Sequence, residues 1–140
     1  MRRTRALLIA ISALACLAGE AHVFRAPQHL SELFGGYYRG DGTGYNVTLI
    51  LNPDRSYSAI WRGCLGKYGT SSGEWSLEDG RVLLRPTEEA GMLQGHLRQL
   101  LVGYKSGVLF LIPYPIEDYF QRYGPDRYSA FSRTESPLAE

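Results

Sequence analysis

Residues 61–75, read as WRGCLGKYGTSSGEW, hold the densest group of side chains that could bind a ligand or a partner. The segment places four glycines, a cysteine, a lysine and a tyrosine between two tryptophan-bearing stretches that alternate like β-strands. Aromatic rings beside a flexible polar loop are typical of a pocket mouth or a partner-binding rim. A wide, twisted hairpin whose tryptophans only fill the core is the simpler alternative. If the chain has a site, we expect it here, with these candidates: Trp61, Arg62, Cys64, Lys67, Tyr68 and Trp75.

Cys64 and His96 are the candidates for a nucleophile and its base. The chain has neither the G-x-S-x-G motif of a hydrolase nucleophile nor the H-E-x-x-H motif of a zinc protease. A lone cysteine more often packs as a small hydrophobic residue, and we predict a buried Cys64. We therefore expect a protein that is not an enzyme. The alternative is a small hydrolase-like enzyme that uses Cys64 or His96.

No metal, cofactor or nucleic-acid site is expected. The three histidines are His22, His29 and His96, and His96 has no partner at metal-ligand spacing. Lysine and arginine number 15 against 14 acidic residues, for a net charge of +1, so the chain lacks the basic footprint of a nucleic-acid-binding protein.

The glycine-rich stretch YYRGDGTGYN, residues 37–46, has several interpretations. RGD is a cell-adhesion tripeptide, DGTG resembles the start of a calcium loop, and clustered glycines can hold a phosphate. A calcium loop needs further carboxylates, and a phosphate loop needs a strand before it, a helix after it and a lysine. A sharp corner between two strands explains every residue, because glycine permits positive φ and aspartate bonds its own backbone. We predict a strand-to-strand corner.

The N-terminus resembles a secretory signal. Three arginines precede an apolar run over residues 6–19, which as a helix would rise about 21 Å. This length falls short of a hydrocarbon core of about 30 Å. We expect a signal peptide over residues 1–21 and a secreted or periplasmic protein. Cleavage after Ala15 or lipidation of Cys16 are alternatives, and we expect membrane attachment only if Cys16 is lipidated or the signal stays uncleaved.

The rest of the chain predicts an all-β domain. Apolar residues alternate with polar ones over residues 46–51, 56–62 and 74–78, as in strands with one buried face. NPDR at 52–55, EDGR at 78–81 and YKSGV at 104–108 are turn sequences between such runs. We predict a linker with a short helical turn over residues 22–34, a β domain over 35–134 and a tail over 135–140. The expected architecture is an antiparallel up-and-down barrel or curved meander of about eight strands. One amphipathic helix over residues 113–124 precedes the last strand.

SELFGGYYRGDG, residues 31–42, resembles the start of lipocalin-like (calycin-type) barrels. There a short helical turn leads into a first strand with a glycine-x-aromatic signature, which Gly36 and Tyr38, or Gly35 and Tyr37, would match. In that family an arginine of the last strand packs over the aromatic ring, and Arg133 is placed to do so. The resemblance implies a small exported bacterial barrel. We expect a non-enzymatic binding module that holds a small apolar ligand or a protein partner at the barrel mouth. A purely structural or inhibitory envelope protein is a further alternative.

Overall fold

The computed structural model describes residues 23–40, 44–116, 118, 121–122, 124–126 and 128–135. The predicted signal over residues 1–21, the centre of the predicted corner at 41–43 and most of the predicted tail at 135–140 lie outside these ranges. Within them, no helix has the length and apolar character needed to cross a bilayer.

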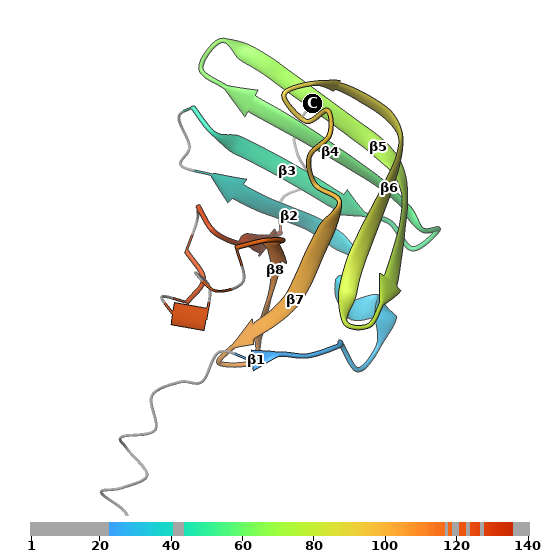
Figure 1. Cartoon of the computed structure of the whole chain (residues 1–140), viewed down its shortest axis with the longest axis vertical. Coiled ribbons are helices and arrows are strands. Elements are labelled where there is room, and N and C mark those ends of the chain that lie inside the picture. The colour runs from blue at the N-terminus through green and yellow to red at the C-terminus, as the bar shows by residue number, and fades with distance from the viewer. Residues whose placement is uncertain are drawn as a thin grey trace, which may run out of the picture.

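The described chain forms a closed antiparallel β-barrel, as the sequence predicts (Figure 1). Each of the strands β2 to β8 pairs with the next strand in the sequence, and the β2–β9 pairing closes the barrel. The short strand β1 is an addition that pairs with β7. The strand bounds are β1 (Val23–Phe24), β2 (Gly35–Gly40), β3 (Asn46–Leu51), β4 (Ser56–Gly63), β5 (Gly66–Glu78), β6 (Arg81–Gly91), β7 (Gln99–Lys105), β8 (Val108–Pro113) and β9 (Phe131–Thr134).

Tight turns set the register of the hairpins. Asp79 and Gly80 both have positive φ, at 49° and 74°, as a two-residue hairpin turn requires. Ser106 and Gly107 repeat this geometry between β7 and β8. At the third turn, the amide of Arg55 donates to the carbonyl of Asn52 over 3.1 Å. The three turns predicted from the sequence are therefore confirmed.

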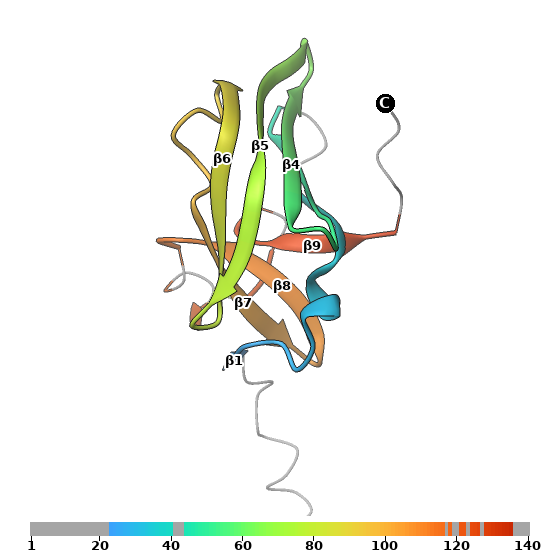
Figure 2. The ribbon, with the colours of Figure 1, turned by 90° about the vertical axis from the view of Figure 1, so that its right-hand side faces the viewer.

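One end of the barrel is packed solid. The 3-10 helix η2 (Leu30–Leu33) lies at this end, and its Leu33 is fully buried beside Trp75 and Tyr37 in a continuous apolar core. Figure 2 shows β4, β5 and β6 side by side along the length of the molecule, with η2 near their lower ends. Side chains thus fill the barrel interior at the η2 end.

Arg133 of β9 connects η2 to the barrel through hydrogen bonds. Its guanidinium donates to the carbonyls of Phe34, over 2.9 Å, and of Glu32, and it lies 5.4 Å from the ring centre of Tyr37. The Tyr37 hydroxyl donates to the carbonyl of Leu33 over 2.9 Å, and burial raises the pKa of this phenol to about 12. The ring next to the Arg133 guanidinium is therefore that of Tyr37.

The structure corrects two further predictions, the burial of Cys64 and the extent of the helix over residues 113–124. Cys64 is exposed, which corrects the prediction that it is buried. It lies with Leu65 in the turn that joins β4 to β5, beyond the end of the core. The helix predicted over residues 113–124 begins too early, because Pro113 ends β8 and Tyr114 and Pro115 form a turn. Asp118, Gln121 and Arg122 are helical, and residues 117, 119, 120 and 123 lie outside the described ranges.

Candidate functional site

A cavity of about 310 Å³ lies at the end of the barrel opposite η2. Its wall comes from the end of β2, the start of β3, the ends of β4 and β8, and the loop that joins β6 to β7. Most of the lining is aromatic or aliphatic and includes Tyr45, Val47, Trp61, Leu93, Leu97 and Pro113. Met92 and Tyr114, which are 54% and 52% exposed, also line it. The volume is at the lower end of the range for small-molecule sites, about 300–1,000 Å³.

Three lining residues form one row across adjacent strands. Arg39 of β2 is in register with Val47 of β3, and Val47 is in register with Trp61 of β4. Because paired strands lie about 4.8 Å apart, the row places Arg39 and Trp61 about 10 Å apart along the same wall, with the smaller valine between them. The pleat turns all three side chains to the same side of the sheet, toward the cavity.

Arg39 is a largely buried cation at this end of the barrel. Its guanidinium carbon lies 5.0 Å from the ring centre of Tyr45 and 5.2 Å from that of Phe131, within the range of cation–π attraction. Its Nε atom is buried without a hydrogen-bond partner. Burial lowers the pKa of Arg39 to about 10, so the guanidinium still carries its charge at neutral pH.

Trp61 presents a second unsatisfied donor. Its indole ring makes an edge-to-face contact with Tyr45, with 4.5 Å between ring centres, and its Nε1 is buried without a hydrogen-bond partner. These two nitrogens are the only buried side-chain polar atoms without a partner among the described residues, and both belong to residues that line the cavity. A buried donor left unpaired costs free energy, so a bound acceptor would be favoured here.

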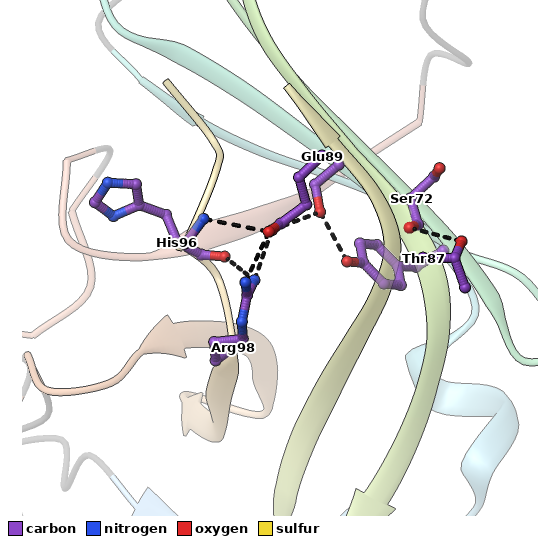
Figure 3. A network of polar contacts seen from close by, with 8 residues as sticks. Ser72, Thr87, Glu89, His96 and Arg98 are labelled. Carbon is purple, nitrogen blue, oxygen red and sulfur yellow. Dashed lines mark hydrogen bonds and ion pairs between the residues drawn. The ribbon is translucent and has the colours of Figure 1, made fainter. Parts of the chain in front are cut away.

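The β6–β7 loop forms one side of the cavity, and an ion pair holds it in place (Figure 3). Arg98 donates to both carboxylate oxygens of Glu89, over 2.6 and 2.7 Å, and the amide of Gly95 donates to the same carboxylate over 3.2 Å. Ser71 of β5 also donates a hydrogen bond to Glu89 over 3.4 Å, and it shares a second hydrogen bond with the Tyr57 hydroxyl over 2.8 Å. The Glu89 carboxylate therefore ties the base of the loop to the barrel wall.

We expect Glu89→Gln to loosen this loop. The Glu89 side chain is only 14% exposed and its pairing with Arg98 is bidentate, so its loss should lower the free energy of unfolding by about 1 kcal/mol. Amide hydrogen exchange should speed up over residues 92–98. Glu78→Gln is the matched control, because the Glu78–Arg85 pair is exposed on both sides and its loss should change neither measurement. Equal effects of the two variants would contradict the assignment.

The contribution of Glu89 should also depend on pH. The hydrogen bonds from Arg98 hold the pKa of the Glu89 carboxyl below its usual value. A carboxyl whose pKa is lower in the folded than in the unfolded protein stabilises the fold above its unfolded-state pKa, near 4.3 for glutamate. That stabilisation disappears as the pH falls through the lowered folded-state pKa. The stability gap between the wild type and Glu89→Gln should therefore be full at pH 7 and close in acid, as urea titrations at several pH values would show.

The candidates from residues 61–75 do not gather at one site. Trp61 lines the cavity, whereas Arg62, Cys64 and Lys67 are exposed around the β4–β5 turn and do not line it. Tyr68 is half-buried and its ring packs on Gly63. Trp75 belongs to the core at the η2 end. Of the pair considered for a hydrolase, His96 lines the cavity and Cys64 does not.

Sequence reasoning missed Arg39, Tyr45 and Leu97. A signal for Arg39 was present, since it shares the inward period of Tyr37 and a charge at an inward position is unusual. Leu97 has a φ of 52°, a strained left-handed conformation that apolar residues rarely adopt and that no sequence rule indicates.

Among the described residues, no group of three or more histidine, cysteine, aspartate or glutamate side chains could hold a metal ion. In comparisons with known proteins, no family model, no curated protein and no solved structure matches this chain.

Proposed function

We propose that this protein is an exported, non-enzymatic binding module that holds a small apolar ligand at the open end of its barrel. The cavity carries the proposal. It lies at the end of the barrel opposite the packed core, and aromatic and aliphatic side chains form most of its wall. Such a site buries an apolar ligand without rearranging the core.

The proposal includes membership of the lipocalin-like barrels and export by the N-terminal signal. The stacking of Arg133 over Tyr37, next to a 3-10 helix that leads into β2, supports the family resemblance. The arginines and apolar run of residues 1–19 support export. The defined volume of the cavity favours a small molecule over a protein partner.

The two tryptophans allow a direct test with bromo-octane, because bromine quenches tryptophan fluorescence only at short range. Trp75→Phe leaves Trp61, at the cavity, as the only tryptophan, and Trp61→Phe leaves Trp75, in the core at the η2 end. We expect bromo-octane to quench Trp75→Phe in a saturable manner and to leave Trp61→Phe nearly unchanged.

Each alternative outcome has a clear meaning. Absence of saturable quenching in both variants would contradict the binding of a small apolar ligand. Equal quenching in both would place the ligand away from the cavity.

A further inference from the structure

We infer that the cavity selects apolar ligands that carry a carboxylate, which Arg39 and Trp61 bind through their unpaired N–H groups. This inference rests on the proposed function, because it concerns the ligand of the same cavity. It specifies the chemistry of one end of that ligand and the residues that recognise it.

The chemistry of the two unsatisfied atoms points to an acceptor. Nε of Arg39 and Nε1 of Trp61 are both donors and cannot accept a hydrogen bond. An alcohol oxygen has two lone pairs but no charge, whereas a carboxylate offers two oxygens, about four acceptor positions and a negative charge. The cross-strand row Arg39–Val47–Trp61 places both donors on one wall, and both residues contact the ring of Tyr45.

The positive charge of Arg39 also favours a ligand that carries a carboxylate. Tyr45 and Phe131 offer their ring faces to the guanidinium, and neither carries a negative charge that could neutralise it. The described residues that line the cavity include no aspartate or glutamate, and His96 is the only other side chain there that could carry a positive charge. A largely buried cation that has no carboxylate beside it among the described residues gains most from a ligand that brings one.

Apart from His96 and the hydroxyls of Tyr45 and Tyr114, the side chains of the remaining lining residues favour an apolar body. Leu93 and Leu97 of the β6–β7 loop and Pro113 of β8 give the carboxylate no further donors from their side chains. A free inorganic anion would therefore leave most of the cavity surface without a partner. An acid with a flexible hydrocarbon chain can place its carboxylate at Arg39 and fold its chain into the remaining volume.

The test compares octanoate with octanol, two probes with the same hydrocarbon chain length, by isothermal titration calorimetry on the mature protein at pH 7. We expect octanoate to bind the wild type at least about 10-fold more tightly than octanol. Arg39→Met keeps a long apolar stem and removes the charge, so it should reduce octanoate binding to the level of octanol and leave octanol binding unchanged. Trp61→Phe should weaken octanoate binding by a smaller factor, because it removes one neutral donor and keeps an aromatic ring at the position.

Arg62→Met is the matched control. It removes an arginine directly after Trp61 that is exposed and does not line the cavity, so it should bind both probes like the wild type. Thermal unfolding followed by circular dichroism checks that Arg39→Met folds.

Equal affinity of the wild type for both probes, or undiminished octanoate binding by a folded Arg39→Met, would overturn the carboxylate inference and leave the apolar binding site in place. Failure of both probes to bind the wild type would count against the proposed function itself.

Discussion

Replacing Trp75 by alanine should lower the free energy of unfolding by about 3–5 kcal/mol, the usual range for loss of a large aromatic residue from a core. Trp75 is 2% exposed and makes an edge-to-face contact with Phe34, with 6.1 Å between ring centres. Its Nε1 donates to the carbonyl of Asn52 over 3.0 Å, and the guanidinium of Arg55 lies 4.9 Å from its ring. Truncation would leave a cavity where η2, β5 and the β3–β4 turn meet, and the Asn52 carbonyl would keep only its hydrogen bond from the Arg55 amide.

Trp61→Ala is the matched control, since it removes the same side chain from the other end of the barrel. Trp61 is only partly buried, borders an existing cavity and makes no hydrogen bond through Nε1. Its removal should cost less than half as much. Urea unfolding followed by circular dichroism measures both variants without depending on tryptophan fluorescence. Equal losses would show that the open end is as tightly packed as the η2 end, which would contradict this account of the interior.

The sequence predicted the barrel because its strands bury one face each. Val47, Leu49 and Leu51 alternate inward along β3, and each of the three is fully or almost fully buried. Asp79-Gly80 could be recognised as a hairpin turn because the backbone there needs positive φ at two successive positions. Such signals are local, so a single chain reveals them.

The site was harder to predict, because it depends on which strand ends meet across the barrel. The β2–β3 corner was predicted, but Arg39 was considered with the corner although it belongs to β2. Only the register of β2, β3 and β4 shows that Arg39 and Trp61 share a wall. The prediction for Cys64 was wrong for a similar reason. The prediction rested on the fact that most free cysteines are buried in a core. This cysteine instead lies in a turn beyond the last core layer.

The bend in the β5–β6 ribbon determines where the cavity can form. The register shifts between Ser72 and Gly73, where Thr87 is an extra residue on β6 whose hydroxyl donates to the carbonyl of Ser72 over 3.3 Å (Figure 3). Before the bend, β6 pairs with β7 over Arg81–Leu83. After it, the β6–β7 loop takes the place of a paired strand and contributes Leu93 and Leu97 to the cavity wall.

Gly73→Ala should therefore lower the free energy of unfolding by at least about 3 kcal/mol, at the upper end of the range for overpacking. A Cβ at Gly73 would lie 2.2 Å from the carbonyl oxygen of Arg85, 2.7 Å from Cα of Pro86 and 2.8 Å from the amide nitrogen of Thr87. These are backbone atoms, so no side-chain rotation relieves the overlap and β6 must move away from β5. Because β6 leads into the loop at the cavity, binding of bromo-octane should weaken as well.

Gly44→Ala supplies the comparison, because a Cβ there meets no atom within 4 Å. Alanine at such an open position removes freedom mainly from the unfolded chain, so stability should stay the same or rise slightly. Urea unfolding of the two variants separates the close approach of β5 and β6 from the general effect of replacing glycine. If Gly73→Ala proved as stable as Gly44→Ala, the two strands could not lie this close at the bulge, and the bend would no longer explain how the open end forms.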